Sequence, residues 1–85
     1  LRTSSFVNVR MREADLTGAR CQGSSLRDVD LSGAWLHGAD FSECDLRGSD
    51  LSSLEPAKVD LKGAIITIEQ AIVVASALGL DVRPE

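Results

Sequence analysis

The sequence predicts an all-β solenoid that is closed at one end by an α-helix. Three observations carry this prediction. Large or apolar residues recur at every fifth position, small or apolar residues recur two places before them, and the five-residue period stops at Thr67. An internal repeat of this regularity indicates a solenoid in which each repeat packs on its neighbours.

The repeat occupies residues 4–66 and is clearest where the chain reads ADLTG, VDLSG and CDLRG, at residues 14–18, 29–33 and 44–48. A period of five fits neither the 3.6 residues of a helical turn nor the alternation of a strand. Each unit is therefore expected to be a short extended piece followed by a turn. The central residues are Phe6, Met11, Leu16, Cys21, Leu26, Leu31, Leu36, Phe41, Leu46, Leu51, Leu61 and Ile66.

The last place of the unit is expected to form a corner. Glycine recurs there, which suits a turn with positive φ. Four units would close a square coil, and about three such coils would stack at a strand spacing of about 4.8 Å. Residues twenty apart would then form columns. Pro56 interrupts the central row, which predicts either an altered corner or a tolerated loop at residues 52–58.

Composition restricts the function. The 85 residues make one small domain with a net charge of −4, and no basic stripe of the kind that a nucleic-acid-binding protein needs is present. No apolar run reaches the length of a membrane span and no signal peptide opens the chain, so a cytoplasmic location without membrane contact is expected. Leu1 already stands at a central place of the repeat, which suggests an incomplete N-terminal end.

No catalytic, metal or cofactor site is predicted. Cys21 and Cys44 fall on the two inward rows and are expected to be buried, reduced thiols, and a single histidine with no CxxC pair argues against a metal site. The repeat aspartates line flat walls and do not converge in a pocket. His37 and Trp35 are both outward, so they form either an ordinary surface pair or a small binding spot.

A helix is predicted after residue 67. Thr67 and Gln70 form a capping box, and Gly79 provides the stop. One face of residues 68–78 is apolar and is expected to cover the last coil: Ile68, Ala71, Ile72, Ala75 and Leu78.

Further apolar side chains of this segment fall outside that face. They indicate either scattered surface residues or a dimer interface, for which we nominate Val73, Val74, Ala77 and Leu80. The repeat and the helix divide the chain into residues 1–66 and 67–85.

The repeat resembles the pentapeptide-repeat family, whose pattern is A(D/N)LxG and whose fold is a right-handed quadrilateral β-helix. Residues 61–80 are also similar to the end of Qnr-type and mycobacterial fluoroquinolone-resistance pentapeptide proteins. The matching positions are Gln70, Ala71, Gly79 and Leu80. In those proteins the terminal helix joins two β-helices end to end, so the resemblance implies a homodimer.

The same resemblance implies a partner, DNA gyrase or topoisomerase IV, which such rods are thought to bind as mimics of duplex DNA. Ten acidic and eight basic residues give the repeat a net charge of −2, whereas duplex DNA carries about nine charges over the roughly 15 Å of three coils. Net charge is therefore a poor match. The candidate acidic surface is Asp30, Asp40, Asp45, Asp50 and Asp60. The alternative is a scaffold or spacer module with another protein partner.

Overall fold

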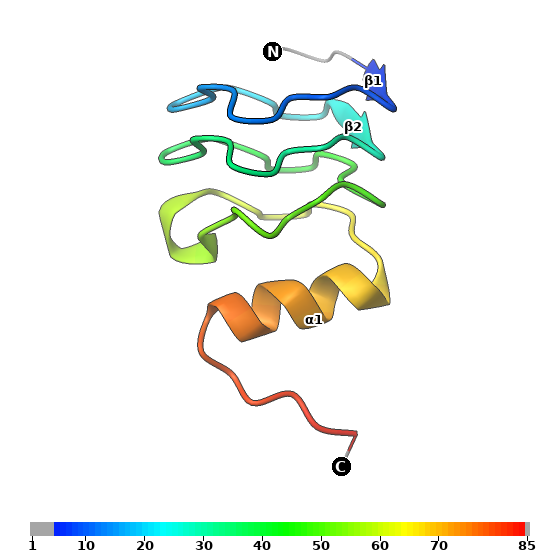
Figure 1. Ribbon diagram of the computed structural model, residues 1–85, viewed down its shortest axis with the longest axis vertical. Coiled ribbons are helices and arrows are strands. Elements are labelled where there is room, and N and C mark those ends of the chain that lie inside the picture. The colour runs from blue at the N-terminus through cyan, green and yellow to red at the C-terminus, as the bar shows by residue number, and fades with distance from the viewer. Residues whose placement is uncertain (1–4, 85) are drawn as a thin grey trace.

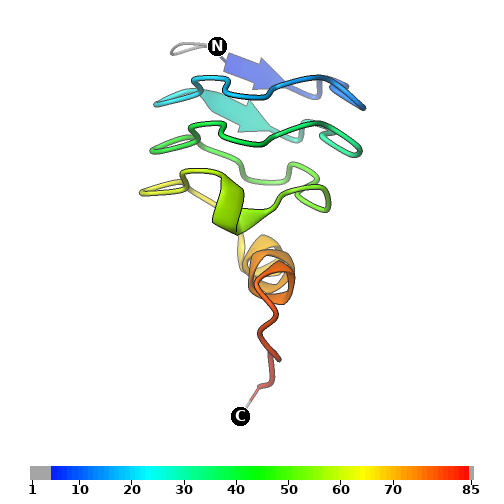
Figure 2. The same cartoon turned by 90° about the vertical axis from the view of Figure 1, so that its left-hand side faces the viewer.

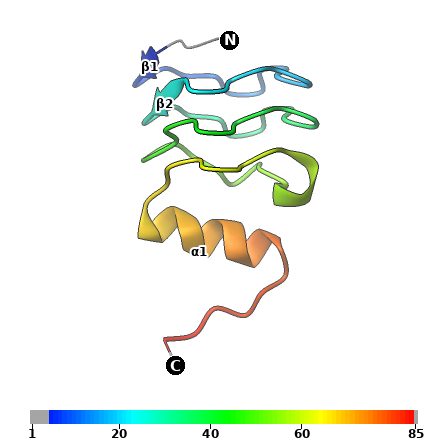
Figure 3. The same cartoon turned by 180° about the vertical axis from the view of Figure 1, so that it is seen from behind.

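The computed structural model describes residues 5–84, so Leu1 and Ser4 of the predicted rows lie outside the described residues. The chain winds in stacked turns around a common interior, and a single helix lies across the far end (Figure 1). The same layers are visible from the side and from behind (Figures 2 and 3). The elements are β1 (Ser5–Val7), β2 (Ser25–Arg27), the 3-10 helix η1 (Pro56–Lys58) and α1 (Ile68–Ala77).

Every backbone pairing between turns is parallel and joins residues twenty apart. Strands β1 and β2 pair with Phe6 opposite Leu26. The remaining pairs are isolated bridges: Arg10 with Asp30, Asp15 with Trp35, Arg20 with Asp40, Ser25 with Asp45, Asp40 with Asp60, and Asp45 with Ile65. This offset is the one that the sequence predicts, because four five-residue units occupy twenty positions. Residues twenty apart therefore form columns along the axis of the stack.

Turns within the repeat follow from one recurring hydrogen bond. The carbonyl of a central residue accepts from the amide three residues on, as between Leu16 and Ala19 at 2.9 Å or Phe41 and Cys44 at 3.0 Å. The third residue of such a turn often needs positive φ. Within residues 5–84, glycine meets that need at six corners, and four non-glycine residues also adopt φ between 55° and 59°: Asn8, Glu13, Asp28 and Glu43.

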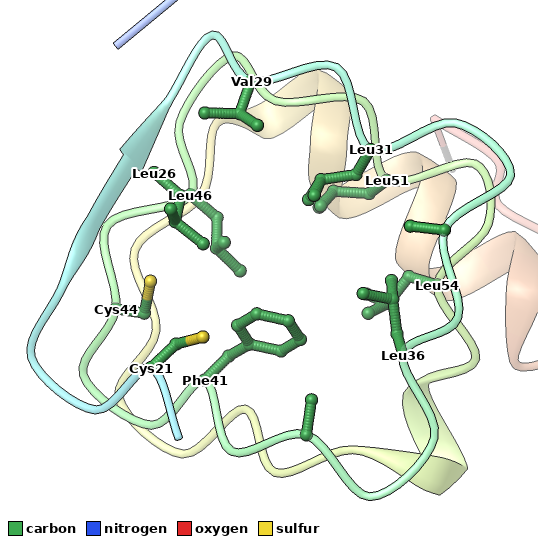
Figure 4. Packing of buried hydrophobic residues seen from close by; sticks show 12 residues of the cluster. Cys21, Leu26, Val29, Leu31, Leu36, Phe41, Cys44, Leu46, Leu51 and Leu54 are labelled. Carbon is green, nitrogen blue, oxygen red and sulfur yellow. The ribbon is translucent and has the colours of Figure 1, made fainter. Parts of the chain in front are cut away.

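The interior consists of the inward rows, as the sequence predicts. Leu26 lies beside Leu46 and Leu31 beside Leu51, so the core is built from ladders of like side chains (Figure 4). Cys21 and Cys44 are free and fully buried. Burial raises the pKa of both thiols, that of Cys44 to about 12. Both cysteines therefore remain protonated at neutral pH.

Pro56 produces an altered corner, one of the two outcomes that the sequence left open. It begins η1, in which the Lys58 amide donates to the Glu55 carbonyl at 2.8 Å. The Lys58 carbonyl then accepts from the Gly38 amide at 2.7 Å, and Asp60 pairs with Asp40. The extra curvature is thus absorbed within one corner, and the register of the columns is kept.

The structure confirms the predicted capping box at the start of α1 and the predicted glycine stop at its end. The Thr67 hydroxyl accepts from the Gln70 amide at 3.2 Å, and the Gln70 side chain accepts from the Thr67 amide at 2.9 Å. At the other end Gly79 has φ of 85°, and the Leu80 amide donates to the Ala75 carbonyl at 3.0 Å. With the bond from the Gly79 amide to the Ser76 carbonyl at 3.0 Å, this forms a Schellman motif, which closes the last helical turn.

The face of α1 that covers the last turn is not the predicted one. Ile68 is 81% exposed and Ile72 is 48% exposed, whereas Gln70 is only 7% exposed and Val74 packs against the core. Hydrogen bonds of the Gln70 side chain account for this orientation of the helix. The Gln70 Nε2 donates to the Leu46 carbonyl at 2.6 Å and to the Ser49 carbonyl at 2.9 Å. Hydrogen bonding of these buried carbonyls outweighs burial of the apolar stripe.

Candidate protein-binding surfaces

The aspartates of the repeat are part of its turns. Each one precedes a central residue, and one carboxylate oxygen accepts a hydrogen bond from the backbone amide two residues further on. The distances are 2.9–3.2 Å, and the aspartates are Asp15, Asp30, Asp40, Asp45, Asp50 and Asp60. This contact is the short-range bond that makes aspartate common in turns. The acidic residues of the sequence therefore have a structural role as well as a charge.

These hydrogen bonds stabilise the ionised carboxylates. The pKa of Asp30 is lowered by its bonds from the Ser32 side chain and backbone, and Ser42 lowers that of Asp40 in the same way. Asp45 differs because its Oδ1 and Oδ2 accept from Arg47 Nε at 2.9 Å and Nη2 at 2.8 Å. The guanidinium lowers the pKa of Asp45 from 3.8 to about 2.

The five candidate acidic residues do not form one patch. Asp40 and Asp60 lie one above the other in a column that begins with Arg20. Asp30 lies in another column, where it is bridged to Arg10. Asp50 is the next residue of that column, and its amide donates a hydrogen bond to the Val29 carbonyl at 3.0 Å. Asp45 lies in a third column, between Ser25 and Ile65. The structure therefore brings these carboxylates together in pairs at most.

Trp35 lies in the column of Asp15 and Glu55, and His37 follows two positions later in the same turn. The Trp35 side chain is exposed, and His37 Nε2 lies 3.3 Å from the Glu55 carboxylate. Both line an open cavity of about 280 Å³, whose walls are Gly33, Ala34, Trp35, Leu36, His37, Ser53 and Glu55. Sequence reasoning did not include Glu55 in this site. The available signal was the offset of twenty residues between Trp35 and Glu55.

A second cavity, of about 430 Å³, lies between η1 and the end of α1. Its lining residues are Leu54, Glu55, Pro56, Ala57, Lys58, Ala77 and Leu78. Glu55 lines both cavities.

The end of the chain carries most of the exposed apolar surface. Of the nine large exposed hydrophobic residues in the described chain, seven lie from residue 65 onward: Ile65, Ile68, Ile72, Val73, Leu78, Leu80 and Val82. Among the residues nominated for a dimer interface, Val73, Ala77 and Leu80 are exposed, while Val74 is half-buried against the core. Part of the Val74 side chain therefore belongs to the contact between the helix and the solenoid.

Within residues 5–84 no helix is long and apolar enough to cross a membrane, and no group of three or more His, Cys, Asp and Glu side chains could hold a metal ion.

The sequence matches the family described as pentapeptide repeats (8 copies) over residues 1–33 and 24–67. The chain belongs to this family. Pentapeptide repeats imply a right-handed β-helix, which agrees with the parallel columns. No relative is found among the curated proteins.

Among solved structures, this pentapeptide-repeat protein is similar to QnrB1, a plasmid-mediated fluoroquinolone resistance protein. A trypsin-treated variant of QnrB1 aligns at 24% identity with a TM-score of 0.59, covering 94% of this chain and 49% of QnrB1. Full-length QnrB1 gives 24% identity and a TM-score of 0.58, over 91% and 46% of the two chains. The present chain thus spans about half the length of QnrB1, and the likeness concerns the fold.

The Asp45–Arg47 pair predicts a pH dependence of stability. Because the folded pKa of Asp45 is below its ordinary value, the pair stabilises the fold above pH 3.8 and this contribution is lost as the pH falls toward 2. Asp45→Asn keeps the turn acceptor but removes the charge. At pH 7 it should cost about 0.5–1 kcal/mol, as for other solvent-exposed pairs, and its stability should vary less between pH 4 and 2.

Urea denaturation followed by circular dichroism at several pH values measures this difference. Asp50→Asn is the matched control, since Asp50 also accepts from a turn amide, that of Ser52, at 2.9 Å. An Asp45→Asn profile with the slope of the parent would contradict the assignment.

Proposed function

We propose that this protein is a non-enzymatic, protein-binding rod that acts on DNA gyrase or topoisomerase IV and protects it from fluoroquinolones. The single observation behind the proposal is that a pentapeptide solenoid ending in α1 aligns with QnrB1 over 94% of the chain. Outward side chains on the columns present a regular surface, and binding to such a surface needs no catalytic pocket. A cytoplasmic location follows from the nature of these partners.

The proposed coil geometry gives the rod its regular walls. Four five-residue units close each coil into a quadrilateral, and about three coils stack along the axis. The constant offset of twenty residues between bridged partners supports this arrangement. The rod would thereby hold outward charges at a fixed spacing along each column.

Mimicry of duplex DNA would depend on the distribution of charge. Asp40 and Asp60 are stacked at one strand spacing in a single column, and their turn bonds use one oxygen of each carboxylate, Oδ1. Gln22 is a further side-chain donor to Asp40, but both carboxylates would still present negative charge to the basic groups of a DNA-binding enzyme. This column is the best candidate for the acidic surface, because Asp45 is already paired with Arg47.

We also propose that two copies associate through α1. The face that Gln70 turns toward the solenoid leaves Ile68 and Ile72 exposed, and Val73 and Leu80 extend the apolar surface. Contact between two such surfaces would remove them from water, which is the usual driving force of association. The C-terminal acidic columns of the two copies would then lie close to the centre of a longer rod.

A scaffold or spacer role with another protein partner is the second candidate. It is favoured by the turn bonds of the aspartates, which account for their presence without a DNA-like partner.

The topoisomerase proposal predicts an effect on DNA gyrase. At micromolar concentration the protein should raise the fluoroquinolone concentration that is needed to inhibit supercoiling. Asp40→Asn with Asp60→Asn keeps both turn acceptors and removes two charges, so it should weaken the effect roughly fivefold. The measurement is a gel-based supercoiling assay with and without the drug.

Asp15→Asn is the control for this assay, because it neutralises one turn aspartate of the same kind in a different column, that of Trp35. No effect of the parent protein on gyrase or topoisomerase IV would favour the scaffold role.

The dimer proposal predicts that Val73→Asp dissociates the protein. A charge at a buried interface position cannot be hydrated, so the variant should elute as a monomer of 9.1 kDa while the parent has twice that mass. Size-exclusion chromatography with light scattering measures both masses. Val7→Asp, a matched change at an exposed valine of β1, should remain dimeric. A dimeric Val73→Asp would remove that residue from the interface.

A further inference from the structure

Trp35 occupies a place in the repeat where aspartate is structurally useful. At six equivalent places a carboxylate accepts the amide two residues on, whereas Trp35 offers no acceptor to the amide of His37. The indole does not join the core either, since the residue is 65% exposed. A tryptophan here adds neither a turn bond nor core packing. A single exposed aromatic is ordinary on a protein surface, so the surroundings must decide its role.

The wall of the solenoid opens next to Trp35. The column of Arg20, Asp40 and Asp60 is bridged along its whole length, and Asp15 is bridged to Trp35. In the part of the chain that the structure describes, no bridge continues from Trp35 to Glu55. The Glu55 carbonyl instead accepts from Lys58 within η1. The altered corner at Pro56 therefore leaves the cavity of about 280 Å³ between Trp35 and Glu55.

The chemistry of this cavity favours a cation. Trp35 presents an aromatic face, and the Glu55 side chain is more than half exposed, with His37 Nε2 at 3.3 Å. None of the seven described residues that line the cavity is lysine or arginine. A guanidinium group can stack on an indole and at the same time donate two hydrogen bonds to a carboxylate. An ammonium group cannot do both with the same planar geometry.

The size of the cavity limits the occupant. Sites for drug-sized ligands occupy about 300–1,000 Å³, so this open cavity of about 280 Å³ lies just below that range and has room for a single side chain. Glu55 also lines the second cavity of about 430 Å³, which extends to Leu78 at the end of α1. A protein segment that places one residue at Trp35 therefore has room to continue along the surface toward the helix.

We propose that the cavity between Trp35 and Glu55 binds an arginine side chain of a protein partner, with the guanidinium stacked on the indole and paired with the carboxylate. This site is independent of the topoisomerase assignment and of the Asp40/Asp60 column. It would serve equally in a scaffold protein.

Trp35 is the only tryptophan of the chain, so its indole N–H gives a single, unambiguous NMR signal. The experiment titrates the protein with N-acetyl-arginine methylamide and, at equal ionic strength, with the citrulline analogue, which is neutral and nearly isosteric. The arginine compound should shift the indole signal saturably, and the citrulline compound should not. Glu55→Gln should weaken binding roughly fivefold, the value of one exposed ion pair.

Glu43→Gln is the matched control, because Glu43 is an exposed glutamate of another column, and it should bind the arginine compound as the parent does. Unchanged signals from the remainder of the chain show that each variant is folded. Equal shifts with the arginine and citrulline compounds, unchanged binding by Glu55→Gln, or no saturable shift up to about 50 mM would each overturn the proposal. Equal binding of N-acetyl-lysine methylamide would overturn the preference for arginine.

Discussion

The Gln70 carboxamide holds the end of this solenoid closed. A stack of turns satisfies its backbone by pairing each turn with the next, so the last turn needs another source of donors. Gln70 supplies two of them, to the carbonyls of Leu46 and Ser49, while its oxygen caps the first turn of α1 through Thr67. One side chain therefore starts the helix and fixes it to the solenoid.

The orientation of α1 follows from this contact. Gln70 and Val74 are one helical turn apart and must both face the solenoid, which places Ile68 and Ile72 toward solvent. The same orientation brings Ala77 and Leu78 close to η1 and creates the larger cavity. The apolar surface proposed for dimerisation and the groove beside Glu55 are both consequences of how the end of the rod is closed.

The outward surface shows how a repeat combines structure and recognition. Each repeat aspartate holds its turn with one oxygen, so its presence is explained without a partner. Places that depart from the repeat are therefore more informative about binding than places that follow it. Trp35 and Pro56 are two such departures, and the structure places both beside Glu55.

The sequence predicted what a repeated backbone requirement determines: the columns of twenty, the inward rows, the corners and the capping box. It did not predict features that depend on the hydrogen bonds of one particular side chain, as those of Gln70 do. The helical wheel favoured Ile68 and Ile72 as the buried face because apolar periodicity takes no account of hydrogen bonds to buried carbonyls. At Trp35 the sequence left open a binding spot formed with His37 but did not include Glu55, because the cavity between them arises from η1, a local departure that periodicity alone does not describe.

Replacement of Gln70 by glutamate tests this account most directly. The variant keeps the size of the side chain and the acceptor for Thr67 but presents a carboxylate to two buried carbonyls. It should lower the free energy of unfolding by about 2 kcal/mol or more, as measured by urea denaturation at pH 7, whereas Glu69→Gln at the exposed neighbouring position should change it by less than about 0.5 kcal/mol. A Gln70→Glu protein as stable as the parent would contradict the central role of this contact.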